Sequence, residues 1–435
     1  MSSIAPSVFL VVLFAAAMIC LPPLHPIQMY SAPWAVATTL YALKLLPYRT
    51  LSWSTVALIC GSALIFSVAV LASECLGSRR WSHTKSTGSD WALPGRAVAA
   101  KYAAWVALLL GTPLFLVFLT QTASRFGLTS TLLDSKSIRD ALVSQPPPRS
   151  SLYEFLAFPA AALWSLSAVL ATNPAAKRRC LLACACAVGS LYFLTGREPL
   201  VNALIVSVVI QLMTRERPVN GRHIAMALGA LASGAVVIFV GIGALGGHTF
   251  NRSGIETFDN VFARHQSVSV LALPYEDVSA PVAALDVQLS ISSTWGRMYG
   301  CATAAYECTL FHHMGLNVKE APPAPPFTGI PLPWNAYTYL DNFLLDGGKA
   351  LTLVLVALTG LLTGLAWSFA RRHNRYGAIA YAFSVPVLIF SYRQNLMDTF
   401  VIYALVAMGL LWISARFALR GEWLFTLRSF WSRSW

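Results

Sequence analysis

Long apolar stretches recur along the chain, and short polar segments separate them. The hydrocarbon core of a bilayer is about 30 Å thick, so one spanning helix needs about 20 mostly apolar residues. The chain has 435 residues, of which 56% are hydrophobic and only 11% are charged. This composition is more apolar than that of an ordinary soluble domain. We therefore expect an integral membrane protein with α-helical spans, because a helix satisfies its own backbone hydrogen bonds in lipid.

The positions of these stretches predict an all-α bundle of about eleven transmembrane helices, within a range of about 10 to 12. In chain order the stretches are 4–21, 29–46, 54–73, 101–120, 152–171, 180–194, 199–214, 224–245, 350–370, 377–390 and 399–415. The first stretch also resembles a secretory signal in length. Residues 1–24 contain no Lys or Arg, however, so the basic start of a signal peptide is missing and we expect a membrane helix.

Basic residues follow every second apolar stretch. The clusters are Arg79, Arg80 and Lys85; Lys177, Arg178 and Arg179; Arg215, Arg217 and Arg222; Arg371, Arg372 and Arg375; and Arg416 and Arg420. Cytoplasmic loops carry the excess of Lys and Arg, so these loops are expected to face the cytoplasm. Topology then explains the net charge of +13, and we expect no nucleic acid as a partner. This orientation places the N-terminus, Lys44 and Arg49 outside, unless the pattern misses one helix.

The predicted organisation has four parts: N-terminal transmembrane helices (1–245), one long periplasmic loop with short helices (246–349), C-terminal transmembrane helices (350–415) and an amphipathic cytoplasmic tail (416–435). The loop includes a proline-rich segment, expected to form an extended strap. It also includes Cys301 and Cys308, for which an oxidising compartment would permit a disulfide. Seven residues apart on a helix they would be about 10 Å from each other, so a bridge requires a turn between them.

Arg197 stands just before the apolar stretch 199–214, and Glu198 and Pro199 follow it. A cation in the first helical turn is disfavoured by the positive end of the helix dipole, so an anion is expected nearby. Helix N-termini bind phosphates, and a guanidinium group matches phosphate oxygens. Two alternatives remain open: Arg197 extends to lipid headgroups, and Glu198 only caps the helix.

Further arginines occur on the predicted outer side, against the positive-inside trend. They are Arg252, Arg264 and Arg297 in the long loop, and Arg393 in the turn before the last helix. As a set they indicate an anionic substrate. Individually they could instead pair with loop carboxylates, which are Glu256, Asp259, Glu276 and Asp277, and Arg393 could anchor to headgroups.

Candidate bases in the loop have no motif-level spacing; they include His265, His312 and His313. The cysteines show no metal-ligand spacing, and no nucleotide loop or zinc helix is present. We therefore expect neither a metal nor a cofactor.

A short passage carries a family resemblance. Asn335-Ala336-Tyr337-Thr338 is followed by Asp346-Gly347-Gly348 and an apolar helix. This resembles the Asn-x-Tyr-Thr and Asp-x-Gly passage through which the long periplasmic loop of Wzy-type O-antigen polymerases re-enters the membrane. The Thr-Gly-Arg start ending at Arg197, the late outer loop and Asn395 before the last helix are also similar to that family.

The resemblance implies a glycosyltransferase of the bacterial inner membrane. Such an enzyme polymerises undecaprenyl-pyrophosphate-linked oligosaccharide repeat units at the periplasmic face into O-antigen, capsule or exopolysaccharide, without a metal. Membrane lipids, a chain-length regulator and a flippase would be its partners. In this chain, Arg197, Arg264 and Arg297 would bind the pyrophosphate, and Arg393 could approach the same surface as a further substrate-binding residue. His265 or Asp341 would be the base, and Asn335 and Tyr337 would shape the sugar site.

Three rivals remain. An O-antigen ligase uses the same donor but a lipid A core acceptor. A lipid-linked sugar flippase or another transporter should show paired repeats and broken helices, and the sequence shows neither. A noncatalytic membrane scaffold would tolerate replacement of the outer arginines. The sequence leaves the sugars and their linkage open.

Overall fold

The computed structural model describes the chain in segments: 2–81, 94–127, 153–191, 197–214, 260–264, 272–291, 298–304, 308, 311–312, 314–316, 328–330, 332–334, 338–372 and 374–420. The chain divides into two compact units. Unit 1 comprises Met1–Ser82, Phe250–Ser368 and Ser384–Phe400, and unit 2 comprises His83–Thr249, Phe369–Phe383 and Val401–Trp435. Each unit is described by itself.

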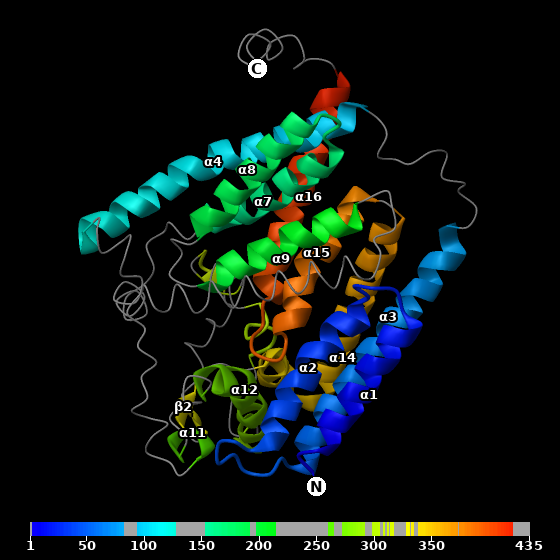
Figure 1. Ribbon diagram of the computed structural model, residues 1–435, viewed down its shortest axis with the longest axis vertical. Helices are drawn as coiled ribbons and strands as arrows, with labels where there is room; N and C mark the ends of the chain where they lie inside the picture. Colours follow the sequence, from blue (N-terminus) through cyan, green and yellow to red (C-terminus); the bar gives the residue numbers. More distant parts are fainter. Residues whose placement is uncertain are drawn as a thin grey trace. The chain divides into compact units, whose positions relative to one another are not determined.

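In the described residues the regular secondary structure is helical apart from one small hairpin (Figure 1). The helices are α1 (Ala5–Cys20), α2 (Pro26–Leu43), α3 (Trp53–Trp81), α4 (Pro94–Phe126), α7 (Glu154–Leu170), α8 (Pro174–Ser190), α9 (Arg197–Met213), α11 (Val261–Arg264), α12 (Ala272–Ile291), α14 (Tyr339–Arg371), α15 (Arg375–Phe390) and α16 (Met397–Arg420). Strands β1 (Thr328–Ile330) and β2 (Leu332–Trp334) pair antiparallel. Each apolar stretch that falls on described residues coincides with a helix. The stretch 224–245 and residues 421–435 of the tail lie outside them.

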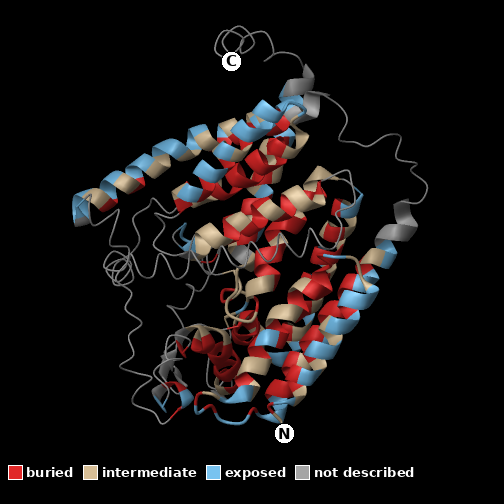
Figure 2. Cartoon of the chain, in the orientation of Figure 1, coloured by how far each residue is buried: buried red, intermediate tan, exposed pale blue. Residues whose placement is uncertain are grey.

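Four helical segments in the described part of the chain are long and apolar enough to cross a membrane. They are Trp53–Leu76, Val98–Arg125, Tyr339–Arg371 and Thr399–Phe417. Large apolar side chains are exposed on them, and Figure 2 shows exposed residues along α1 and α4. A soluble protein rarely exposes so much contiguous apolar surface, so the chain is an α-helical membrane protein.

Two glycines one turn apart let α14 pack directly on α3 within unit 1. A Cβ at Gly360 would lie 2.7 Å from the Phe66 carbonyl oxygen, and one at Gly364 would lie 2.9 Å from the Val70 carbonyl oxygen. Small residues at this spacing allow two membrane helices to approach closely. Figure 1 shows α3 and α14 side by side.

The helix α14 is broken near its start. Gly348 has φ 76° and ψ −170°, a region that is essentially restricted to glycine. A Cβ at Gly347 would lie 2.9 Å from the Leu351 Cβ. Both glycines of the Asp-Gly-Gly sequence are therefore required by the backbone. The sequence showed no broken helix, and for α14 that interpretation is wrong.

The two segments of α14 lie side by side instead of end to end. Tyr339 Oη donates to Tyr30 Oη at 2.9 Å, and the Tyr30 ring stacks on the Phe66 ring at 4.4 Å between centroids. The backbone of Phe66 lies against Gly360. In a straight helix Tyr339 and Gly360 would be about 32 Å apart, yet both reach the Tyr30–Phe66 pair. Residues 339–346 therefore fold back along the rest of α14, and we name them the re-entrant helix.

The segment 44–52 connects α2 to α3 without an additional helix. Leu45 N donates to Tyr275 Oη at 2.9 Å, and Tyr48 Oη and Ser279 Oγ are 3.0 Å apart. This segment therefore lies at the same end of unit 1 as α12, which we name the α12 end. The described residues before α3 contain no missed helix. The 20-residue α12 is also longer than the short helices expected in the loop.

Unit 2 packs α7 between α4 and α8. Small side chains make this close packing possible: Gly111 of α4 leaves room for the Leu156 side chain of α7. The Phe158 ring stacks on the Tyr403 ring at 4.6 Å, which attaches α16 to the same core. Unit 2 is thus a compact helical bundle of its own.

Candidate functional site

The residues predicted to bind substrate fall in different parts of the molecule. Arg197 is the first residue of α9 in unit 2, and its side chain lies outside the described residues. Arg264 ends the short α11 of unit 1 and is exposed. His265, Arg297, Asn335 and Tyr337 lie outside the described residues. Asp341 and Arg393 are described, and both belong to unit 1.

Asp341 stands in the first turn of the re-entrant helix. Its Oδ2 accepts a hydrogen bond from Thr338 Oγ1 at 2.8 Å, and its backbone N–H donates to Thr338 O at 3.1 Å. The side chain is 1% exposed, and Oδ1 has no hydrogen-bond partner among the described residues. A buried acceptor without a donor costs about 1–3 kcal/mol. Oδ1 of Asp341 is therefore available to accept a hydrogen bond from a donor that is not among the described residues.

The turn after α15 packs against the start of the re-entrant helix. Tyr339 N donates to Ser391 O at 2.9 Å, and Trp34 Nε1 donates to Ser391 Oγ at 2.8 Å. Ser391 is two positions before Arg393, and Tyr339 is two positions before Asp341. The fold thus brings together two predicted residues that are far apart in the sequence.

Asp346 and Asn395, both part of the family resemblance, form hydrogen bonds to the same loop, residues 298–304. The Asp346 carboxylate accepts backbone hydrogen bonds from Gly300 N at 2.9 Å, Ala302 N at 2.8 Å and Thr303 N at 2.9 Å. Asn395 Nδ2 donates to Thr303 O at 3.2 Å. Converging backbone N–H groups form a fixed anion-binding nest, and here a buried carboxylate of the chain fills it. Asp346 therefore anchors the loop.

Cys301 lies in this loop and forms a disulfide with Cys308, with a Cα–Cα distance of 5.5 Å. Residues 298–304 form turns instead of a helix: Cys301 N donates to Met298 O, and Ala304 N donates to Gly300 O. The expected requirement for a turn is confirmed. The disulfide and Asp346 fix the loop from two sides.

Arg393 faces an acidic residue of α12. Its Nη2 lies 3.7 Å from Asp277 Oδ2, and the two side chains are 29% and 20% exposed. Pairing with a loop carboxylate was an alternative from sequence for the loop arginines; the structure shows it for Arg393, for which the alternative was a headgroup anchor. The distance is too long for a charge-assisted hydrogen bond, so the pair is loose.

Glu276 is next to Asp277 and was weighed from the sequence only as a solvated ion-pair partner. The structure corrects this: its side chain is 3% exposed, and Oε1 has no hydrogen-bond partner among the described residues. Burial, and then the negative charge of Asp277, raise the pKa of Glu276 to about 7. Burial was not visible in the sequence, because Glu276 follows no recognisable motif.

The α12 end of unit 1 thus combines a cation with buried acceptor oxygens that are still open. Arg393 can hold an anion, and Asp341 or Glu276 can accept a hydrogen bond or a proton from a hydroxyl group. No cluster of three or more His, Cys, Asp or Glu residues suited to a metal occurs among the described residues.

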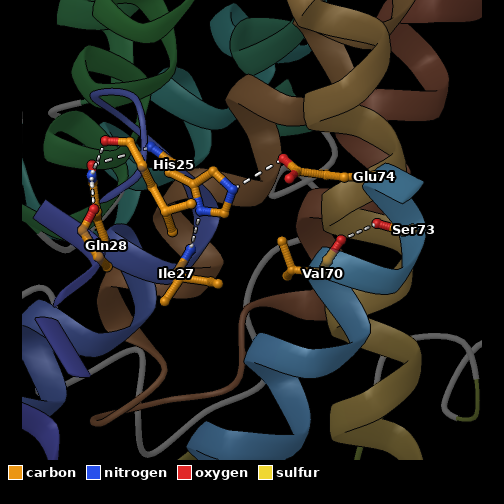
Figure 3. Close-up of polar contacts among 8 residues, drawn as sticks. His25, Ile27, Gln28, Val70, Ser73 and Glu74 are labelled. Atoms are coloured by element: carbon orange, nitrogen blue, oxygen red, sulfur yellow. Dashed lines mark hydrogen bonds and ion pairs between the residues drawn. The ribbon is translucent and has the colours of Figure 1, made fainter. Parts of the chain in front are cut away.

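The opposite end of unit 1 carries a second polar pair, the hydrogen-bonded His25 and Glu74 (Figure 3). His25 Nε2 lies 3.0 Å from Glu74 Oε1, and Ile27 N donates to His25 Nδ1 at 3.3 Å. Because Nδ1 accepts, Nε2 carries the proton and donates to Glu74. The Gln28 side chain accepts from His25 N and donates to Ala17 O at 2.9 Å. These contacts cap α2 and tie it to α1 and α3.

No protein-family model, curated protein or solved structure matches this chain. Its function is therefore inferred from its residues and their geometry.

Proposed function

We propose that this protein is a membrane glycosyltransferase that polymerises undecaprenyl-pyrophosphate-linked oligosaccharide repeat units, like the Wzy-type polymerases that its motifs resemble. One observation carries the proposal. Within an α-helical membrane protein, the re-entrant helix presents Asp341, a buried carboxylate with one open oxygen, beside the turn that bears Arg393. A buried carboxylate with an unbonded oxygen is typical of a functional site, and the Tyr339–Ser391 hydrogen bond joins its helix to the turn of Arg393.

The reaction needs both groups. A hydroxyl at the nonreducing end of the acceptor repeat unit attacks the anomeric carbon of the donor, and the bond from that carbon to the pyrophosphate oxygen breaks. Asp341 receives the hydroxyl proton, and undecaprenyl pyrophosphate departs with the bonding electron pair. Arg393 offsets the negative charge of the departing group, which an arginine can do without a metal.

We propose about eleven spans in a bacterial inner membrane. Three features support a location of the proposed site at the outer face of that membrane. The α12 end carries the Cys301–Cys308 disulfide, which forms in oxidising compartments. The helix α3 begins at that end, and the part of α14 after Gly348 runs parallel to it, because Gly360 packs on Phe66 and Gly364 on Val70. Basic residues follow both helices. Basic loops are cytoplasmic. The proposed site would therefore face the periplasm.

A chain-length assay tests the function. A strain lacking the gene would be complemented with the wild type, Arg393→Gln or Glu74→Gln, and its surface polysaccharide would be separated by length. Glu74 is a matched control, because it is 29% exposed and pairs with a buried residue at the opposite end of unit 1. Long chains should disappear with Arg393→Gln and persist with Glu74→Gln. Unchanged ladders for both variants, at equal expression, would overturn the proposed role of Arg393.

The same strains separate the rivals. A polymerase leaves long glycan on undecaprenyl pyrophosphate, a ligase moves it to lipid A, and a flippase defect leaves single repeat units on the cytoplasmic leaflet. The break in α14 is a feature that transporters share. Locating the accumulated lipid-linked intermediate therefore decides between the classes.

A further inference from the structure

The acidic pair Glu276–Asp277 has a feature that the proposed reaction does not use. Asp277 pairs with Arg393 at 3.7 Å, and the adjacent Glu276 is buried with an open oxygen. Arg393 therefore pairs with Asp277, and Glu276, the residue before it on α12, feels the charge of Asp277. Any anion that binds Arg393 has to take the place of Asp277 or share the cation with it.

We propose that binding of a phosphate-type anion at Arg393 is coupled to uptake of one proton by the Glu276–Asp277 pair. This inference rests on the proposed function for the identity of the natural ligand, a diester of pyrophosphate with two negative charges. Arg393 offsets one of these charges, and the proton taken up by the acidic pair offsets the other. The proton comes from solvent on binding and returns to solvent on release.

The direction of coupling follows from electrostatics. A nearby cation favours the ionised form of a carboxyl group, and a nearby anion disfavours it. When the ligand engages Arg393, the acidic pair loses its cation and gains a negative neighbour. The proton affinity of Glu276, which the charge of Asp277 already raises, then rises further.

The groups that surround Glu276 support its selection as the proton carrier. Asp277 stands beside it on α12, and Arg393 approaches from the turn after α15. Tyr275 of α12 and Tyr48 of segment 44–52 lie close by, and burial raises the pKa of both phenols. Both phenols therefore stay neutral near pH 7. Glu276, with a pKa of about 7, is already poised to change charge there.

The pH dependence has a definite sign. Because ligand binding takes up a proton, the affinity for the anion falls as the pH rises through about 7, with at most a tenfold loss per pH unit for full uptake. The coupling fades below about pH 6, because Glu276 then already carries its proton before the ligand arrives. We expect about a threefold weaker affinity at pH 7.5 than at pH 6.5.

Calorimetry on the purified full-length protein in nanodiscs measures the coupling directly. The probe is symmetric dimethyl pyrophosphate, whose remaining acidic groups are fully ionised near pH 7, so it brings no proton of its own. Titrations at pH 7 in two buffers of different ionisation enthalpy give the number of protons taken up. The wild type should take up a substantial fraction of one proton per ligand. Binding without any uptake overturns the coupling and leaves the proposed function standing.

Variants identify the carboxyl group that takes up the proton when the probe binds. Glu276→Gln should bind the probe without proton uptake, whereas Glu74→Gln should behave like the wild type. Asp277→Asn should bind the probe more tightly, because the competitor for Arg393 is removed. Weaker binding by Asp277→Asn would show that Asp277 only positions Arg393, and uptake retained in Glu276→Gln would assign the proton elsewhere. Either result overturns the proposal.

The two proposals fail in different ways. Probe binding with proton uptake in a protein that makes no long glycan contradicts the polymerase function alone. A wild type that does not bind the probe at millimolar concentration contradicts both. Because Glu276 is buried, Glu276→Gln also tests folding, so the wild-type measurement in the two buffers decides the coupling by itself.

Discussion

The two ends of unit 1 each carry a polar side-chain pair that includes a carboxylate, and the two pairs are built differently. His25 is 1% exposed, and both its ring nitrogens have partners: Ile27 N and Glu74. At the α12 end, Arg393 and Asp277 are 3.7 Å apart, and the neighbouring Glu276 keeps an open oxygen. A polar pair whose role is structural is expected to have all its hydrogen-bonding atoms paired, as the ring nitrogens of His25 are. Open acceptors beside a loosely held cation are costly for stability, so their presence indicates a site for a ligand.

The largest expected effect is on activity at the α12 end. Asp341→Asn keeps the size of the side chain but removes its capacity to accept a proton. Loss of a general base typically costs a factor of about 10²–10⁴ in rate. Polymer formation by purified protein from lipid-linked repeat units should fall by that factor, while the melting temperature stays close to that of the wild type. Equal losses of activity and folded protein would show that Asp341 is structural.

Loss of the disulfide should have the next largest effect. Replacing Cys301 and Cys308 together by serine removes the closure of a short loop, which in the chain-entropy model is worth about 2–3 kcal/mol. The loop stays bonded to Asp346 and Asn395, so we expect lower stability with partial activity. Thermal melting with and without a reductant measures this. Wild type that is insensitive to the reductant would contradict the prediction.

At the opposite end, His25→Ala tests whether the His25–Glu74 pair is only structural. The substitution removes the cap of α2 and leaves Glu74 without its partner, at a cost of about 1–2 kcal/mol. Melting should occur at a lower temperature, while the activity per folded molecule is retained. Gly61→Ala is a control, because a Cβ there meets no atom within 4 Å. Loss of activity without loss of stability would give this end a functional role and break the comparison.

The smallest effect on stability is expected for Asp277→Asn. A loose, partly exposed ion pair contributes about 0–1 kcal/mol. The melting temperature should therefore hardly change, although anion binding at Arg393 changes. A large loss of stability would make this pair resemble His25–Glu74 and remove the contrast between the two ends.

The chain itself determines which segments are helical and apolar, because runs of apolar residues about 20 positions long have no other stable form in lipid. In the described residues each predicted stretch coincides with a helix, although several bounds differ: α14 begins at Tyr339, eleven positions before the predicted start. The need for a turn between Cys301 and Cys308 also followed from local geometry. Gly347 and Gly348 were visible as part of a motif, but their backbone role was not.

Only the tertiary structure decided which polar residues meet. The re-entrant helix depends on the contacts of Tyr339 with Tyr30 and Ser391, which come from distant parts of the chain. Glu276 and Asp346 are both buried, but Glu276 keeps an open oxygen, whereas backbone N–H groups bond to the Asp346 carboxylate. A carboxyl group has the same chemistry in either place until packing removes water from it. Periodicity reports the environment of a helix face, whereas the proton affinity of one acid depends on neighbours that only the fold supplies.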